Sequence, residues 1–157
     1  MDQIIRRRVY QRFMESSPVI QGAGALFYSK SSKRWLFLIR SSGRHKNTWG
    51  FVGGKSEGKE TPSETLLREI NEEIGNTHNT QKIIPLEKFT NNNFTYHTYV
   101  CVTETEFIPV LNHEHKGYCW TEFDAWPKPL HPSVFNSLSI KEIRNKCKTI
   151  SDVISNN

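Results

Sequence analysis

The chain has 157 residues, of which 36% are hydrophobic and 24% are charged, and its formal net charge is +5. This length suits one domain with its own core, and the composition argues against a mostly disordered chain. No apolar run approaches the ~18 residues of a membrane-spanning helix, and no apolar segment follows the N-terminal arginines as it would in a secretory signal. We therefore expect a single domain over residues 1–157 that does not span a membrane, with a core of about 19–150 and a frayed tail at 151–157.

Strand-like and helix-like segments alternate along the chain. Short β-prone runs bounded by turn residues are typical of strands. They occur at residues 19–28, 35–39, 86–89, 94–103 and 118–120. Helical patterns occur at residues 62–74 and at about 139–150. Because helices that are interleaved with strands must cover the faces of a sheet, this order predicts an α/β (α+β) fold with a mixed sheet between helices.

The cysteines and the charge distribution indicate a compartment and a kind of ligand. Cys101, Cys119 and Cys147 are odd in number and far apart, which is typical of reduced thiols in a cytoplasmic protein. Between Gly54 and Gly75 six residues are acidic and three are basic, whereas the rest of the chain has 18 basic and 10 acidic residues. An acidic patch in a basic protein suits a cation bound beside a polyanion such as a phosphate ester.

Residues 62–74 have clear helix boundaries. Thr61 can act as N-cap, Pro62 fits the first helical position, and Glu64 completes a capping box. A glycine follows at position 75, where it can end the helix. The apolar stripe that we expect to face the core is Leu66, Leu67, Ile70 and Ile74.

Three glutamates share another face of this helix. Glu69, Glu72 and Glu73 are spaced i, i+3 and i+4, so their like charges meet on one surface. Arg68 stands four residues after Glu64 and four before Glu72, and we expect it to bridge both. A solvated charged face is the ordinary interpretation of such a run. A bound cation would explain the clustering as well.

Glycines precede the helix. Residues 49–54, Trp-Gly-Phe-Val-Gly-Gly, indicate a strand that ends in a turn at Gly53 and Gly54. Glycine lets the backbone come close to a ligand, so a carbonyl here can join a cation that prefers oxygen. Carboxylates without nearby cysteine or histidine ligands favour Mg²⁺ or Mn²⁺ over zinc.

The spacing of these residues resembles the Nudix box, G-x5-E-x7-R-E-U-x-E-E-x-G-U, in which U is a bulky aliphatic residue. The matching positions are Gly54, Glu60, Arg68, Glu69, Ile70, Glu72, Glu73 and Gly75. The last aliphatic position holds Asn76, a departure that we expect to affect packing after the helix. Flanking segments also resemble the family, over roughly residues 19–135.

The resemblance implies an α/β/α sandwich and Mg²⁺- or Mn²⁺-dependent hydrolysis of a nucleoside diphosphate linked to another group. It implies a metal site of Glu69, Glu72, Glu73 and the Gly54 carbonyl. Gly53 supports the site, and Glu60 and Arg68 shape it. The general base is either one of the box glutamates or Glu114, which is also a candidate ligand. Glu114 lies in the segment Asn112–His115, whose histidines we expect to pack or face solvent.

Substrate recognition is less strongly encoded. Arg40, Arg44, His45 and Lys46 precede the box and suit phosphate oxygens. The aromatic residues that could stack on a base are Phe94, Tyr96 and Trp126, and Leu130–Pro132 could border the pocket.

The expected partner is a nucleotide-type small molecule. ADP-ribose, dinucleoside polyphosphates, nucleotide sugars and nucleoside triphosphates all remain open. One alternative is hydrolysis at the 5′ end of RNA, which the basic surplus favours mildly and the lack of a second RNA-binding domain disfavours. Another is a nucleotide-binding module without activity, which would be expected to have lost box carboxylates. A homodimer is implied only by the resemblance.

Overall fold

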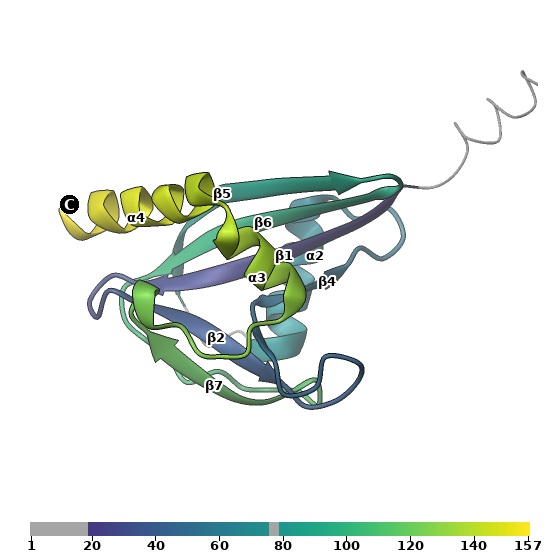
Figure 1. Cartoon of the computed structure of the whole chain (residues 1–157), viewed down its shortest axis with the longest axis horizontal. Coiled ribbons are helices and arrows are strands. Elements are labelled where there is room, and N and C mark those ends of the chain that lie inside the picture. Colours follow the sequence, from purple (N-terminus) through teal and green to yellow (C-terminus); the bar gives the residue numbers. More distant parts are fainter. Residues whose placement is uncertain (1–18, 76–78) are drawn as a thin grey trace, which may run out of the picture.

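The computed structural model describes residues 19–75 and 79–157, and among these residues seven strands form one sheet with helices on both faces (Figure 1). The strands are β1 (Ile20–Ser29), β2 (Arg34–Arg40), β3 (Trp49–Gly50), β4 (Val52–Lys55), β5 (Thr80–Asn91), β6 (Phe94–Thr103) and β7 (His115–Thr121). The helices are α2 (Pro62–Ile74), α3 (Pro132–Ser139) and α4 (Lys141–Ser155), with a 3₁₀ turn η1 (Phe123–Ala125). The expected mixed sheet between helices is confirmed.

The sheet is mixed because β1 has neighbours that run in both directions. The main path is β3-β2-β1-β6-β5, with β4 paired to β1 and β7 paired to β2. β1 and β6 are parallel along their whole lengths, whereas β4 pairs antiparallel with the first half of β1 and β2 with its last residues. β1 therefore changes partner midway, and this change brings β4 to the centre of the sheet next to α2.

Hydrophobic side chains fill the space on both sides of the sheet. One core joins Phe27 of β1 to Leu66, Ile70 and Ile74 of α2. The other joins β1, β2 and β6 to α3 and α4. The predicted stripe on α2 is wrong for Leu67, which is 58% exposed, because residues spaced by four stay on one side of a helix and Leu67 is turned away from them.

Gly53 and Gly54 lie inside β4, opposite Gly24 and Ala23 of β1, so the predicted Gly-Gly turn is wrong. A side chain at Gly53 would overlap the Tyr96 hydroxyl, and one at Gly54 would overlap the Glu69 carboxylate. These glycines therefore make room for neighbouring side chains within a strand.

The C-terminal region is more ordered than its sequence suggested. α4 continues to Ser155, with Ile150 and Ile154 both buried, so the expectation of a frayed tail from residue 151 is wrong. The Tyr28 hydroxyl lies 2.7 Å from Ser155 Oγ and accepts a hydrogen bond from Ser151 Oγ at 3.1 Å. Apolar residues spaced by four carry the helix past its predicted end.

Other predicted elements compare well with the structure. Residues 62–74 and 94–103 match α2 and β6, whereas the predicted 86–89 covers only part of β5, an edge strand with many polar residues. α3 was not predicted.

Cys101 and Cys147 are buried and Cys119 is half-buried, all as free thiols. None of the helices in the described parts of the chain is both long and apolar enough to cross a membrane.

Candidate metal and substrate site

Three carboxylates come together beside β4. Glu69 and Glu73 lie one turn apart on α2, and Glu114 reaches them from the loop before β7, so that one oxygen of each lies within 4.8 Å of the others. The loop is held against the end of α2 because the Asn112 N–H donates to the Glu73 carbonyl at 3.4 Å. The Asn112 side chain in turn accepts from the Glu114 N–H at 3.0 Å.

Glu73 is the most buried of the three, with only 1% of its surface exposed. Its Oε1 accepts from the Gly53 N–H at 3.3 Å, whereas its Oε2 has no hydrogen-bond partner among the described residues. Burial, together with Glu69 and Glu114, raises the pKa of Glu73 to about 9. A buried carboxylate with an unpartnered oxygen is costly unless a cation is bound to it.

His115 does not supply that cation. Its Nδ1 lies 3.5 Å from Glu73 Oε2, but burial lowers the pKa of His115 to about 4, so the imidazole is neutral near pH 7. The donor set therefore consists of clustered carboxylates, and Oε2 of Glu73 is the oxygen without a hydrogen-bond partner among the described residues. Such oxygen-rich sets suit Mg²⁺ or Mn²⁺, and these residues fit the expected metal.

Arg68 organises the carboxylates around this cluster. Its Nε and Nη2 donate to the two oxygens of Glu60 at 2.9 and 3.1 Å, and its Nη1 donates to Glu69 at 3.0 Å and to Glu72 at 3.2 Å. A further bond of 2.8 Å to the Lys55 carbonyl fixes the guanidinium to β4. The hydrogen bonds with Arg68 lower the pKa of Glu60. Arg68 thus fixes the position of the Glu69 carboxylate.

One predicted ion pair of Arg68 is replaced by another. Glu64 takes part in the capping box: it accepts from the Thr61 hydroxyl at 3.0 Å, and its N–H donates to Thr61 Oγ1 at 3.2 Å. The capping box is confirmed, and the expected Arg68–Glu64 bridge is wrong. Glu60 takes that position because the turn before α2 carries it back toward Arg68, which spacing along a helix does not reveal.

Glu72 differs from the other box glutamates. Its side chain is 50% exposed and lies 3.2 Å from Arg68, and the structure does not group it with Glu69, Glu73 and Glu114. The assignment of Glu72 as a metal ligand stays a prediction.

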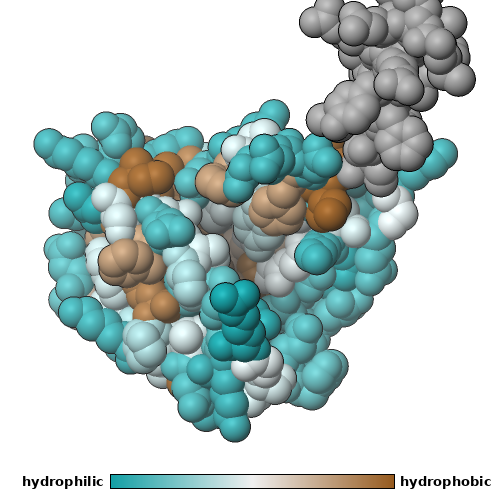
Figure 2. All heavy atoms as spheres, turned by 45° about the vertical axis from the view of Figure 1, so that its right-hand side comes forward, coloured by the Kyte–Doolittle hydropathy of each residue, from teal (hydrophilic) through white to brown (hydrophobic). Residues whose placement is uncertain are grey.

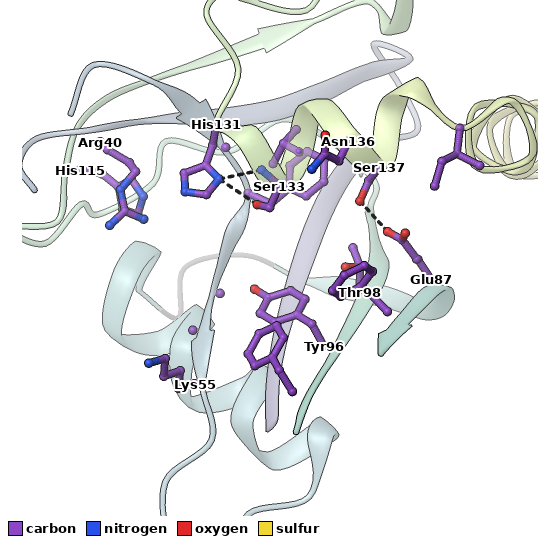
Figure 3. Close-up of a pocket in the computed structure, with 18 residues that line it drawn as sticks. Arg40, Lys55, Glu87, Tyr96, Thr98, His115, His131, Ser133, Asn136 and Ser137 are labelled. Atoms are coloured by element: carbon purple, nitrogen blue, oxygen red, sulfur yellow. Dashed lines mark hydrogen bonds between the residues drawn. The ribbon is translucent and has the colours of Figure 1, made fainter. Parts of the chain in front are cut away.

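A pocket of about 520 Å³ opens next to the carboxylates, between α3 and the sheet (Figure 3). At one end it is lined by Arg40, His115 and the β4 backbone, and at the other by Glu87 and Ser137 (Figure 3). The remaining lining residues include Phe89, Phe94, Tyr96, Thr98, His131, Ser133 and Asn136. The surface seen in Figure 2 is mostly hydrophilic, with small hydrophobic groups around a hollow. A pocket of this size holds one small ligand.

The predicted phosphate-binding residues are separated by the fold. Arg40 lines the pocket and is paired across the sheet with His115, whereas Arg44 and Lys46 are exposed on the loop after β2 and are not among the lining residues. His45 packs edge-on against His131, with 4.5 Å between the ring centroids.

The predicted stacking residues are separated in the same way. Phe94 and Tyr96 line the pocket and stack on each other, with centroids 6.0 Å apart and an interplanar angle of 26°. Trp126 instead packs against Phe123 at 5.3 Å.

Some lining residues were missed from the sequence because α3 was missed. Glu87 was assigned to a strand without a role, and Ser133, Asn136 and Ser137 were assigned to no element. A signal for α3 was available: His131 caps its start, accepting from the Ser133 N–H at 3.2 Å, and a proline occupies the first helical position.

A known family matches most of the described fold. A family model described as NUDIX domain matches residues 19–138. A dihydroneopterin triphosphate diphosphatase from Haemophilus influenzae is 32% identical over an alignment of 117 residues, and the match covers 64% of this chain and 72% of the relative. The resemblance expected over roughly residues 19–135 agrees with this match.

Solved structures share the fold at lower identity. A MutT NUDIX hydrolase from Burkholderia pseudomallei is 23% identical with a TM-score of 0.60, over 79% of this chain and 98% of the other. The NUDIX domain of Shewanella oneidensis NrtR, complexed with ADP ribose, is 17% identical with a TM-score of 0.63, over 93% of this chain and 99% of the other.

Proposed function

Since the chain belongs to the NUDIX domain family and is a hydrolase of phosphoanhydride bonds, we propose that it uses Mg²⁺ or Mn²⁺ to hydrolyse the diphosphate linkage of a nucleotide-type compound. The observation that carries this proposal is the carboxylate group of Glu69, Glu73 and Glu114, which lies against Gly53 and Gly54 of β4. These two glycines line the pocket of about 520 Å³. The unpartnered Oε2 of the buried Glu73 supports a cation at that point.

Glu69, Glu73 and the Gly54 carbonyl would hold the metal, which supplies positive charge to phosphate oxygens and acidifies a bound water. Glu73 must lose its proton to bind a cation, and the N–H of Gly53 stabilises the resulting carboxylate. Arg68 keeps Glu69 oriented through the 3.0 Å bond and is itself fixed by Glu60. In this proposal Glu60 and Gly53 have the supporting roles that the resemblance implies.

Glu114 is our candidate for the general base. It is the only exposed member of the three-carboxylate group, and neither a hydrogen bond nor an ion pair ties its side chain to the described residues. Glu69 is already bound to Arg68, and Glu73 is buried. A base must reach the attacking water by a hydrogen bond, and a free carboxylate at the rim of the site can do so.

The substrate also needs residues that bind its phosphate chain. Arg40 and Lys55 line the same end of the pocket as the β4 glycines, and Arg40 can hold a phosphate through two parallel hydrogen bonds. The 32% identical relative is named for action on dihydroneopterin triphosphate, and this supports a triphosphate as the first substrate to test.

The test is hydrolysis of a panel by purified protein with Mg²⁺ and Mn²⁺ supplied separately. The panel holds dihydroneopterin triphosphate, nucleoside triphosphates, ADP-ribose, a dinucleoside polyphosphate and triphosphorylated RNA, with products resolved by mass. Glu73→Gln should abolish turnover, whereas Glu64→Gln, the same change in the capping box, should keep most of it. Turnover that persists in Glu73→Gln, or that does not need a divalent cation, would refute the proposed site.

A further inference from the structure

The end of the pocket opposite Arg40 and His115 carries a carboxylate (Figure 3). Glu87 of β5 is half-buried there, and its Oε2 accepts a hydrogen bond of 2.6 Å from the Ser137 hydroxyl on α3. No cation pairs with Glu87 in the described chain: Lys146 of α4 donates to the Leu86 carbonyl at 3.2 Å instead. An ionised carboxylate accepts several hydrogen bonds, so Glu87 retains accepting capacity toward the pocket.

Between this acidic end and the phosphate end lies a surface suited to a flat ring. Tyr96 and Thr98 of β6 lie between Arg40 and Glu87 (Figure 3), and Phe94 is stacked on Tyr96. Aromatic faces bind heterocycles by stacking whatever their hydrogen-bonding edge. The edge of the ring is therefore left to the polar groups at the Glu87 end.

We propose that Glu87 selects a ring with a 2-amino-4-oxopyrimidine edge, which guanine and pterins share. This edge presents a ring N–H and an exocyclic amine side by side, two donors that match the two oxygens of one carboxylate. Adenine and cytosine place a ring nitrogen acceptor next to their amine, and uracil has one N–H between two carbonyls, so each would face Glu87 with an unpaired acceptor. Asn136, which lines the pocket from α3, can donate to the ring carbonyl. The inference rests on the proposed function only in using this pocket for the substrate ring.

The variant that tests the proposal is Glu87→Gln. Glutamine keeps the size of the side chain, and its carbonyl oxygen can still accept from Ser137. Its amide NH2 group is a donor, however, and cannot accept from the ring N–H. Ser137→Ala is the matched control, because it removes the link between β5 and α3 and leaves the carboxylate in place.

We compare kcat/KM for guanosine triphosphate, inosine triphosphate, dihydroneopterin triphosphate and uridine triphosphate. Inosine triphosphate lacks only the exocyclic amine. The kcat/KM of the wild type should be about 10-fold or more higher for guanosine triphosphate than for inosine triphosphate. Glu87→Gln should lower kcat/KM by about 10–100-fold for guanosine triphosphate and dihydroneopterin triphosphate, with little change for uridine triphosphate. Ser137→Ala should keep the preference. The ranking of the guanine and pterin compounds then identifies which ring is favoured.

Binding of guanosine, inosine and neopterin, without phosphate or metal, separates this inference from the proposed function. Ring-selective binding that Glu87→Gln removes, in a protein that hydrolyses nothing, would refute the proposed function and keep the inference. Metal-dependent hydrolysis with equal rates on guanosine and inosine triphosphates, unchanged in Glu87→Gln, would overturn the inference and keep the proposed function. Equal losses on every substrate, with reduced thermal stability, would also overturn it, because they would assign Glu87 a structural role.

Discussion

Replacing Glu73 by glutamine should stabilise the metal-free protein at alkaline pH even as it removes activity. In the folded chain, burial and the neighbouring carboxylates raise the pKa of Glu73 to about 9, from 4.5 for a free carboxyl. Between these two values the unfolded chain has lost the proton that the folded chain still holds. The contribution of Glu73 to the free energy of unfolding is therefore largest below about pH 4.5 and is lost as the pH rises toward 9. Glutamine carries no such proton.

The size of the effect follows from the linkage relation. Each pH unit in which only the folded protein holds the proton lowers the free energy of unfolding by about 1.4 kcal/mol. Over pH 7 to 9 the wild type should therefore lose about 2–3 kcal/mol relative to Glu73→Gln. This range also avoids His115, whose pKa of about 4 when folded and 6.5 when unfolded places its own contribution at lower pH.

Urea unfolding in the presence of a chelator, at pH 7, 8 and 9, measures this difference. Glu64→Gln serves as the control and should follow the wild type. Adding Mg²⁺ should restore the wild type and leave Glu73→Gln unchanged, because binding to the folded state alone stabilises it. Parallel pH profiles for the wild type and Glu73→Gln would show that Glu73 is already ionised at pH 7 and would refute the reasoning.

The same geometry makes other predictions. Glu69→Gln should lower kcat by about 100-fold or more, as expected for loss of a group that acts in the transition state. Glu72→Gln should lower kcat by less than about 10-fold if Glu72 only contacts Arg68. Equal losses of kcat in steady-state assays would make Glu72 a metal ligand. Gly54→Ala should lower the free energy of unfolding by about 1–3 kcal/mol, because the added methyl group overlaps the Glu69 carboxylate. The same variant should bind Mg²⁺ more weakly in calorimetric titrations. Arg40→Ala should raise KM by about 10-fold and Arg44→Ala by less than about 2-fold, and similar rises in both would place the phosphates outside the pocket.

Local signals predicted the centre of this molecule well. α2 was predicted from its cap, its proline and the spacing of its glutamates, all of which lie within one segment. The grouping of Glu69 and Glu73 follows from that helix alone. Glu114 joins them through a loop far along the chain, and only the family resemblance pointed to it.

Features that depend on contacts between distant segments were harder to predict. Arg68 has several carboxylates within reach. Helical spacing favoured Glu64 as its ion-pair partner, but the turn before α2 places Glu60 beside Arg68 instead. Glu87 faces the pocket only because α3 packs over β5 and β6, and α3 is an eight-residue helix with a short apolar pattern. Gly53 and Gly54 were assigned to a turn because the close approach of Tyr96 and Glu69 is visible only in three dimensions.

The packing of the last turn of α4 gives the protein a fluorescent reporter, Trp35, away from the carboxylate site. Tyr28, whose hydroxyl contacts Ser151 and Ser155, packs its ring against Trp35 with 4.6 Å between centroids. Loosening of the helix end would change the surroundings of that indole and with them its fluorescence. The emission of Trp35, isolated by replacing the other tryptophans, would thus follow the C-terminal helix during urea titration and stay constant during metal titration.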